Sequence, residues 1–498
     1  MSLKKPKIIL WIDTDFITFG FAKSIQEQFD CELYAIIDVT NKTKKFFEKQ
    51  NFVNFKKVWF YHDHIKKLQK EPNYEYLSKF ENEHNINLWI TAQNERIFYN
   101  FNDYHKFETK EILLILEQEC KLFENVLKEV KPDFLFSRVT DLQHNHIFYQ
   151  TCRSFGVKCF MLWSTKLGFK SLIVDEINKE LLLPKTSSTK MSLLELQEYQ
   201  KQNNSFKKVK KYQTENRNSS KELRLAALTF LFSSYDTNNT HYPYYGRTKI
   251  KVLFKEIISR LKKKYRESYI NKNFIKKISH DLPFVYFPLH LDMDRVILLG
   301  APFYTNQIEV IKNIVKSLPI NYELYVKEHP ILKVYGWRKL SFYNELQSIP
   351  RVKLIHPSLN PEEIIKNSSL VISISGTAGL EAAFQNKSSI VLVEQDYSFL
   401  DSVKKITNFS ELPLAIRNFI DKPTDILGLN QYVEYIQKNS FDFDWMEYNL
   451  SVQKTLFFGG NLVDIEIPLD SMKLFLEEQK STFDLLSNEF IKKINKIE

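Results

Sequence analysis

The sequence predicts an α/β protein with two units, each a mostly parallel β-sheet covered by helices. Over the first 180 residues, apolar runs of strand length alternate with amphipathic helices, and the alternation returns at 281–405. Between them, residues 186–280 are polar and rich in lysine, asparagine and serine. Short strands that alternate with helices are typical of parallel sheets, and 498 residues are too many for one ordinary domain.

We therefore predict four segments: an N-terminal α/β unit at 1–185, a basic helical linker or insertion at 186–280, a second α/β unit at 281–405, and a helical extension at 406–498. Two α/β units joined by a linker enclose a cleft, where ligands of such proteins bind.

Hydrophobic periodicity gives the individual elements. In the first unit it predicts strands at 7–12, 31–38, 133–138 and 157–163, and helices at 21–29, 110–132 and 142–156. In the second unit it predicts strands at 284–290, 322–330, 352–357, 370–375 and 388–394, with helices at 306–319, 361–369 and 376–386.

Composition excludes several classes of protein. No apolar run reaches the length that crosses a bilayer, and Asp13 and Asp15 interrupt the first strand too early for a signal sequence, so we expect a cytoplasmic protein. The four cysteines have neither CxxC spacing nor histidine partners, so no metal site is expected from them. The net charge of +10 comes without a nucleic-acid recognition motif, so no nucleic-acid partner is expected.

Residues 250–266 are expected to form a basic amphipathic helix. Apolar side chains recur there at helical spacing, and the remaining face carries Lys251, Lys255, Arg260, Lys262, Lys263, Lys264 and Arg266. This pattern fits either a solvated helix packed on the protein or a helix that binds an anionic membrane surface.

The strand at 322–330 ends in polar residues. It reads "YELYVKEHP", and its last four residues are Lys327, Glu328, His329 and Pro330. Ligands bind at the carboxyl ends of parallel strands, and a proline ends a strand because it has no N–H to donate. We therefore expect Lys327 and His329 to face the cleft.

A second polar group follows the strand at 370–375. Ser375, Gly376 and Thr377 lead into a helix whose first N–H groups would be free to bind an anion. Simple N-capping by a serine or threonine is the alternative interpretation. A phosphate between His329 and this helix would meet several hydrogen-bond donors.

The sequence resembles a known family at these positions. "YFPLH", "NQIEVIKNIVKSLP", "YVKEHP" and "ISISGTAGLEA", in that order, are similar to the capsule-polysaccharide-biosynthesis family of GT-B glycosyltransferases, which includes transferases of Kdo. The "HP" and the downstream Ser/Thr pair also resemble bacterial sialyltransferases. The segment "LDMDR" at 291–295 departs from the pattern expected there.

The resemblance implies two Rossmann-like domains facing a cleft and the transfer of a Kdo or sialic-acid-like sugar. The donor would be CMP-activated, the acceptor a glycan or glycolipid of capsule or lipopolysaccharide synthesis, and no cofactor or metal would be required. It implies that His329 and either Ser375 or Thr377 contact the donor phosphate, with Lys327, Pro330 and Gly376 beside them. Glu381 would approach the ribose.

Sugar transfer also needs a base for the acceptor hydroxyl, on the opposite domain. Asp13 and Asp15 follow the first strand, and Asp141 and His144 follow the strand at 133–138. Asp15 or Asp13 is the preferred candidate, with Asp141 behind them. Helix capping is the alternative role for each aspartate.

Two other functions stay open. "IILWIDTDF" also resembles the D-x-D strand end of metal-dependent phosphatases or polyol-phosphate transferases. A second, isolated D-x-D, Asp292 and Asp294, could instead indicate a metal-dependent glycosyltransferase of the other common fold. A non-enzymatic scaffold at the membrane surface would explain the basic helix without chemistry.

Overall fold

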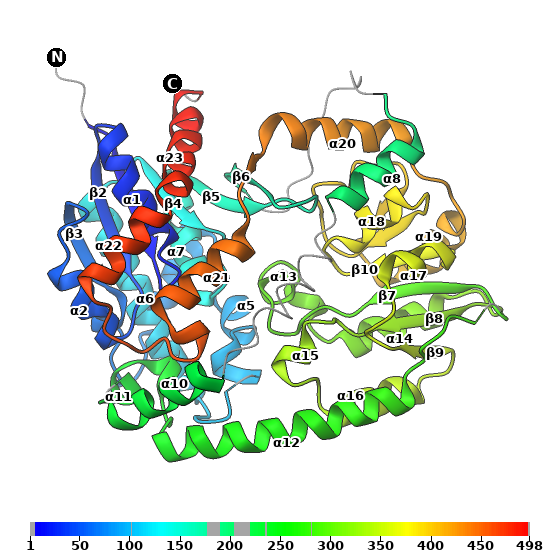
Figure 1. Cartoon of the computed structure of the whole chain (residues 1–498), viewed down its shortest axis with the longest axis horizontal. Helices are drawn as coiled ribbons and strands as arrows, with labels where there is room; N and C mark the ends of the chain where they lie inside the picture. The colour runs from blue at the N-terminus through cyan, green and yellow to red at the C-terminus, as the bar shows by residue number, and fades with distance from the viewer. Residues whose placement is uncertain are drawn as a thin grey trace.

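The computed structural model describes residues 5–100, 102–176, 190–203, 220–234, 237–279 and 281–496. Figure 1 shows two α/β units side by side, each built around its own sheet. Within the described residues the first sheet has the order β13-β6-β5-β4-β1-β2-β3, and the second has the order β12-β11-β10-β7-β8-β9. The predicted fold class, with two mostly parallel sheets, is confirmed.

The first sheet contains every strand that the sequence predicted in that unit. It consists of β1 (Lys7–Ile12), β2 (Glu32–Ile37), β3 (Phe55–Phe60), β4 (Phe134–Arg138), β5 (Lys158–Ser164), β6 (Lys170–Val174) and β13 (Phe441–Asp442). The strands β1 to β5 run parallel, whereas β6 and β13 are antiparallel additions at one edge. Periodicity did not predict β3, β6 or β13.

Helices cover both faces of this sheet. They are α1 (Ile17–Gln28), α2 (Asn41–Lys49), α3 (Tyr61–His64), α4 (Tyr74–His84), α5 (Leu88–Gln93), α6 (Thr109–Val130) and α7 (Gln143–Ser154). The buried core on one face includes residues of α6 and α7, and the core on the other face includes residues of α1 and α2.

The C-terminal part of the chain returns to the first sheet. Helices α21 (Trp445–Leu456), α22 (Leu469–Glu478) and α23 (Lys480–Asn495) complete the core beside α1, as Figure 1 shows. Gly20 in α1 permits this contact, because a Cβ at that position would lie 2.1 Å from the ring of Phe483. The predicted extension at 406–498 is therefore mostly helical, and its last three helices pack on the N-terminal unit.

The second sheet is fully parallel. Its strands are β7 (Phe284–Pro288), β8 (Glu323–Lys327), β9 (Val352–Ile355), β10 (Leu370–Ser373), β11 (Ser389–Val391) and β12 (Val403–Lys405). Around it lie α13 (Arg295–Leu298), α14 (Gln307–Ser317), α15 (Leu332–Tyr335), α16 (Leu340–Ser348), α17 (Pro361–Asn367), α18 (Ala378–Phe384), α19 (Leu412–Phe419) and α20 (Ile426–Asn439).

The middle segment is helical where it is described. It contains α8 (Leu193–Gln202), α10 (Ser220–Phe232), α11 (Thr237–Thr240) and α12 (Lys249–Asn273). Helix α12 runs along both units in Figure 1. The boundaries predicted at 185/186 and at 280 fall outside the described residues, and the four-segment division stays a prediction. No helix in the described part of the chain is both long and apolar enough to cross a bilayer.

Candidate active site

Both sheets have the strand order of a doubly wound fold. The order reverses between β1 and β4 in the first sheet and between β7 and β10 in the second. Ligands of such folds bind outside the carboxyl ends of the strands at this reversal. Asp13 and Asp15 follow β1 and Asp141 follows β4, while Ser375, Gly376 and Thr377 follow β10. The sequence therefore placed its candidates at the two reversal points.

Asp13 and Asp15 shape the turn between β1 and α1. The backbone N–H of Asp15 donates to Oδ1 of Asp13 over 2.9 Å, and the N–H of Ile17 donates to Oδ1 of Asp15 over 2.9 Å. Phe16, which lies between Asp15 and Ile17, adopts a left-handed φ of 57°. Each carboxylate thus keeps one oxygen for the turn and has its second oxygen for other contacts.

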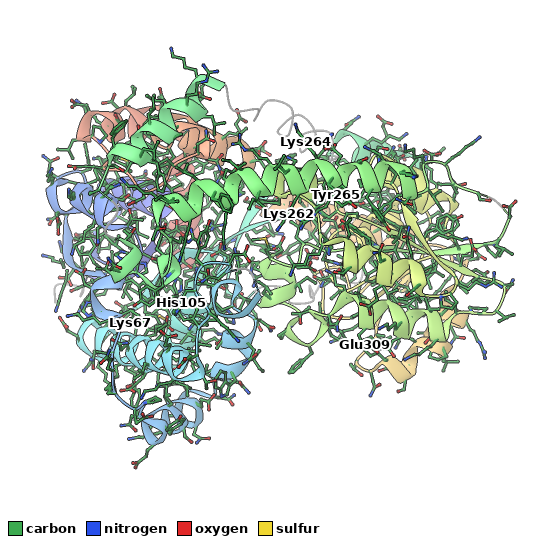
Figure 2. All side chains as sticks on the ribbon, turned by 90° about the horizontal axis from the view of Figure 1, so that it is seen from below. Lys67, His105, Lys262, Lys264, Tyr265 and Glu309 are labelled. Carbon is green, nitrogen blue, oxygen red and sulfur yellow. The ribbon has the colours of Figure 1, made fainter. Side chains whose placement is uncertain are left out.

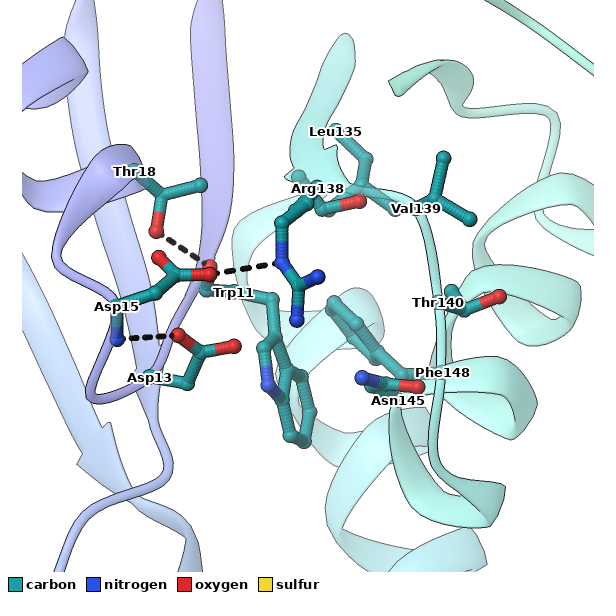
Figure 3. A pocket seen from close by; sticks show the side chains of 11 residues that line it. Trp11, Asp13, Asp15, Thr18, Leu135, Arg138, Val139, Thr140, Asn145 and Phe148 are labelled. Carbon is teal, nitrogen blue, oxygen red and sulfur yellow. Dashed lines mark hydrogen bonds and ion pairs between the residues drawn. The ribbon is translucent and has the colours of Figure 1, made fainter. Parts of the chain in front are cut away.

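Arg138 joins the two sides of the reversal point. Its Nε lies 2.7 Å from Oδ2 of Asp15 and its Nη2 lies 3.2 Å from Oδ2 of Asp141, as Figure 3 shows for the Asp15 contact. The ring of Trp445 from α21 lies 4.6 Å from the guanidinium, and the Tyr448 hydroxyl donates to the carbonyl of Asp15. The C-terminal helices thus form part of this site, which the sequence did not predict.

The pKa values of Asp13 and Asp141 are shifted in opposite directions. Burial, and then the charge of Asp15, raise the pKa of Asp13 well above its usual value, although Arg138 partly offsets this. Burial acts to raise the pKa of Asp141 as well, but the charges of Arg138 and Arg96 lower it overall. Asp13 is therefore the better proton acceptor of the two, since a useful base has a pKa nearer to neutral pH.

A second polar cluster, which sequence reasoning largely missed, lies after β2 and β3. Oδ1 of Asp38 is 3.0 Å from Nε2 of His62, and Oδ2 is 2.9 Å from Nε2 of His144. Nδ1 of His144 contacts the Tyr242 hydroxyl at 3.0 Å, so the linker covers this cluster. The available signal was position, since Asp38 directly follows β2 and "YHDH" at 61–64 directly follows β3.

In this cluster, Asp38 and His144 each stabilise the charged form of the other. Burial acts to raise the pKa of Asp38, but the two histidines lower it overall. Burial acts to lower the pKa of His144, but Asp38 raises it overall. His144 is thus a buried residue that is paired with Asp38.

On the second sheet, Lys327 ends β8 as a buried cation. Burial lowers its pKa to about 8, and the nearby carboxylates of Glu381 and Glu328 act in the opposite direction. Its side chain is 2% exposed. Lys327 therefore supplies positive charge from beneath the strand end instead of reaching into solvent.

His329 is half-buried beside Lys327. Burial, and then the charges of His290, Lys327 and Arg338, lower the pKa of His329 to about 4, so the ring is neutral at pH 7. Its Nδ1 accepts a hydrogen bond from the N–H of Ile331 over 3.3 Å, which leaves the proton on Nε2. His329 can therefore donate one hydrogen bond to a ligand but brings no charge to it. Pro330 follows in the turn before α15.

Glu328 belongs to a buried ion-pair cluster. Its Oε2 lies 3.2 Å from Nε of Arg338 and accepts from the Tyr343 hydroxyl over 2.8 Å. Arg338 also pairs with Asp292 over 3.0 Å, and Asp294 caps α13 by accepting from the N–H of Val296. The "LDMDR" segment is thus held by Arg338, and both aspartates of the second D-x-D have structural partners.

Ser375 and Gly376 face the interior of the second unit. The Ser375 carbonyl lies 2.7 Å from Nε2 of His290, and its hydroxyl accepts from the side-chain amide of Gln395 over 3.0 Å. Gly376 has a φ of 91° and donates its N–H to Gln395 over 3.3 Å. The Gly376 carbonyl accepts from the buried hydroxyl of Tyr397. These contacts use the Ser375 hydroxyl and the Gly376 N–H within the protein.

Thr377 and Glu381 are placed differently. The exposed Thr377 hydroxyl donates to Oε1 of Glu381 over 2.7 Å, and burial raises the pKa of Glu381 despite this bond and despite Lys327. Helix α18 has only seven residues. Of the predicted Ser/Thr pair, Thr377 is therefore the one whose side chain a ligand can reach.

The two candidate edges meet through direct contacts between the units. The Nε of Arg295 in α13 donates to the carbonyl of Thr140 over 2.6 Å, next to Asp141. Lys166 pairs with Asp396 over 2.6 Å in a second contact. Figure 3 shows Thr140 across the small pocket at the end of β1 and β4 from Asp13 and Asp15, with Arg138 between them.

A possible metal-binding group lies away from both edges. Among the described residues, one group of three side chains has ligand atoms within 4.8 Å of one another, namely Glu83, His84 and Glu124. It includes residues of α4 and α6, outside the predicted site. Neither D-x-D is part of it.

Part of the chain is similar to known proteins. Residues 173–400 match the family described as "Capsule polysaccharide biosynthesis protein". Protein FixF of Sinorhizobium fredii is 27% identical over 141 residues, which are 28% of this chain and 33% of that protein. The chain therefore spans about a third of the length of that curated relative.

Solved structures give distant similarities. A β Kdo 2,7 transferase, KpsC of Thermosulfurimonas dismutans, is 12% identical and aligns over 62% of this chain and 78% of its own, with a TM-score of 0.30. UDP-GlcNAc 2-epimerase of Methanocaldococcus jannaschii is 15% identical over 87% and 99%, with a TM-score of 0.27. The resemblance found in the sequence is confirmed to this extent: residues 173–400 match the capsule polysaccharide biosynthesis family, and the chain has the two mostly parallel sheets that the resemblance implied.

Proposed function

We propose that the protein is a glycosyltransferase of capsule or lipopolysaccharide synthesis that moves a Kdo or sialic-acid-like sugar from a CMP-activated donor to a glycan or glycolipid. The observation that carries this proposal is the contact between two chemically different strand edges. One holds Lys327, His329 and Thr377, and the other holds Asp13 and Arg138.

The second-sheet edge suits the donor phosphate. Nε2–H of His329 is a neutral donor, and Lys327 lies beneath it as a buried cation. The exposed Thr377 hydroxyl lies at the same edge and donates its hydrogen to Glu381. Fixed donors aimed at a leaving phosphate stabilise the charge that develops as the bond to the sugar breaks. Glu381 holds Thr377 in place and, in this proposal, leaves its other oxygen for the ribose.

The first-sheet edge suits the acceptor. The acceptor hydroxyl attacks the anomeric carbon of the sugar, its proton passes to Asp13, and the bond from that carbon to the phosphate breaks. The raised pKa of Asp13 makes it a stronger base than an ordinary carboxylate. Asp15 and Asp141 then act through Arg138, whose position they fix.

A thermal-shift series with CMP, CDP, UDP and GDP tests the donor assignment. We expect CMP to raise the melting temperature most, since the "HP" and Ser/Thr resemblance points to CMP-activated sugars. A large shift with UDP and none with CMP would contradict this choice. Magnesium-dependent phosphatase activity that survives mutation of His329 would favour the phosphatase, and a chain that binds no nucleotide would favour a scaffold.

We also propose that α12 attaches the enzyme to an anionic membrane surface. Its exposed apolar side chains, each at least 60% exposed, are Ile250, Phe254, Ile257, Leu261 and Tyr265. Figure 2 labels Tyr265 with Lys262 and Lys264 on this helix, which runs across both units in that view. A helix packed on the protein would bury such a stripe, whereas an interfacial helix inserts it among lipid head groups.

Contacts through Lys249, Lys255 and Arg266 hold α12 on the protein, and none of these residues belongs to the exposed apolar stripe. Nζ of Lys249 donates to the Ser233 carbonyl over 2.7 Å, and Nη1 of Arg266 donates to the Trp337 carbonyl over 2.9 Å. Helix α10 carries further exposed leucines and the 85%-exposed Phe232 near the first of these contacts. A lipid-linked acceptor would then be presented to a protein already on the same surface.

A further inference from the structure

Arg295 holds an unusual place in the contact between the two units. It is the first residue of α13, at the end of the "LDMDR" segment whose role the sequence left open. Its Nε donates to the Thr140 carbonyl across the contact. Thr140 in turn lines the pocket that holds Asp13 and Arg138.

Arg295 lacks the counter-charge that comparable arginines have. Arg138 pairs with Asp15 and Asp141, and Arg338 pairs with Glu328 and Asp292. Within the described part of the chain no carboxylate oxygen pairs with Arg295, and its Nη1 is buried with no hydrogen-bond partner.

A buried guanidinium nitrogen in this state is costly, because it has lost water without gaining a hydrogen bond. Burial lowers the pKa of Arg295, although Asp294 and Asp141 act to raise it. The neighbouring His146 has its pKa lowered to about 4, by burial and then by Arg295, so it adds no second cation. Arg295 therefore carries a positive charge that an anionic ligand could neutralise.

From this arrangement we infer that Arg295 binds an anionic group on the transferred sugar, the carboxylate of an acidic sugar. The inference rests on the proposed sugar transfer. The planar guanidinium matches a carboxylate in a way that an ammonium does not. Arg295 belongs to the second unit and reaches the Thr140 carbonyl beside Asp141 of the first, so it lies at the contact between the two edges that the proposed transfer uses.

The second phosphate of a nucleoside-diphosphate sugar is another anionic group that Arg295 could bind. A carboxylate fits better because the proposed phosphate contacts follow β8 and β10, whereas Arg295 reaches across to the strand end of β4. Three probes separate the sources: CMP, the non-transferable CMP-3-fluoro-N-acetylneuraminate, and UDP-glucose.

Calorimetric titration of wild type, Arg295→Gln and the exposed control Arg417→Gln tests the inference. We expect Arg295→Gln to lose about tenfold in affinity for the carboxylated probe, as one charge-assisted contact is worth, and to keep its affinity for CMP within about twofold. Arg417→Gln should match wild type. Equal affinity of all three proteins for the carboxylated probe would overturn the inference, and so would a loss confined to UDP-glucose.

A second readout separates this inference from the proposed function. Free N-acetylneuraminate and free Kdo carry the carboxylate without a nucleotide. We expect one of them to raise the melting temperature of wild type and of Arg417→Gln, but not of Arg295→Gln. This result would stand even if no nucleotide bound. Equal shifts in all three proteins, or no shift in any, would overturn the inference.

Discussion

The Nε atom of Arg138 lies 2.7 Å from Oδ2 of Asp15, and this ion pair sets the electrostatics of the first-sheet edge. Arg138 takes Asp15 and Asp141 as partners, whereas burial, and then the charge of Asp15, raise the pKa of Asp13, which Arg138 only partly offsets. The pair therefore assigns different roles to side chains that the sequence could not tell apart.

Replacing Arg138 should move the pH profile of the reaction. Its positive charge lowers the pKa of Asp13, so Arg138→Gln should raise that pKa further. Since a base must be deprotonated to act, the acidic limb of kcat/KM should shift to higher pH, and Arg138→Lys should stay nearer wild type. A pH–rate series with CMP-Kdo as donor measures this. An unmoved limb in Arg138→Gln would mean that Asp13 is not the titrating base.

Nucleotide binding should weaken at alkaline pH. Lys327 has a pKa near 8, so its charge is present below that pH and is lost as the pH rises through it. Calorimetry should show CMP affinity falling above about pH 8 in wild type, and Lys327→Arg should keep its affinity there because arginine stays charged. Lys327→Met should lose about tenfold at pH 7. The exposed Lys312→Met is the control, and equal losses in both variants would remove Lys327 from the donor site.

The Asp38 cluster should stabilise the fold. Asp38→Asn leaves two buried histidines without their counter-charge, so we expect a loss of about 3–5 kcal/mol in the free energy of unfolding. Asp63→Asn, which breaks only the exposed pair with Lys44, should cost at most about 1 kcal/mol. Urea denaturation of both variants measures the difference. Similar losses in the two would show that the cluster contributes no more than a surface pair.

The same cluster gives a pH dependence of stability with a defined sign. Asp38 has a lowered pKa, so its contribution is present above its unfolded pKa and is lost as the pH falls through the folded one. His144 has a raised pKa, so its contribution is present below its unfolded pKa and is lost as the pH rises through the folded one. Urea denaturation between pH 6 and 9 should show an alkaline decline in wild type that Asp38→Asn lacks. The same decline in both proteins would contradict this.

Membrane binding through α12 should need both charge and apolar surface. The protein should co-sediment with anionic vesicles at low salt and be released at high salt, since each basic residue near the surface is worth about 1 kcal/mol. Replacing Lys262, Lys263 and Lys264 by glutamate should abolish binding, and Phe254→Ser with Leu261→Ser should weaken it. Equal binding to neutral vesicles, or none to anionic ones, would leave α12 as solvated surface.

The sequence predicted the elements whose pattern is strong and local. It missed β3 because this edge strand carries the exposed Lys56 and Lys57, which break the apolar run but suit a strand with a free edge. It missed β6 and β13 because an antiparallel hairpin and a two-residue strand lie outside the β/α alternation that it followed.

The site could be predicted only in part for a similar reason. Strand ends show which residues lie at an edge, so the sequence alone placed Asp13, Lys327 and Thr377 at the two edges. Partners that come from distant segments leave no pattern. The contacts of Arg138 with Trp445 and of Asp38 with His144 join residues more than 100 positions apart, and the pairing of Glu328 with Arg338 could not be told from a solvated charge.

Transfer of sugar from CMP-Kdo to lipid-linked glycan precursors, measured as CMP release and as extension of the glycan, tests the central claim most directly. We predict that wild type produces both, that Asp13→Asn binds CMP as wild type does but loses at least about a hundredfold in rate, and that Lys327→Met loses affinity as well. An Asp13→Asn variant as active as wild type, or a wild type that binds CMP-Kdo and transfers nothing, would contradict the account.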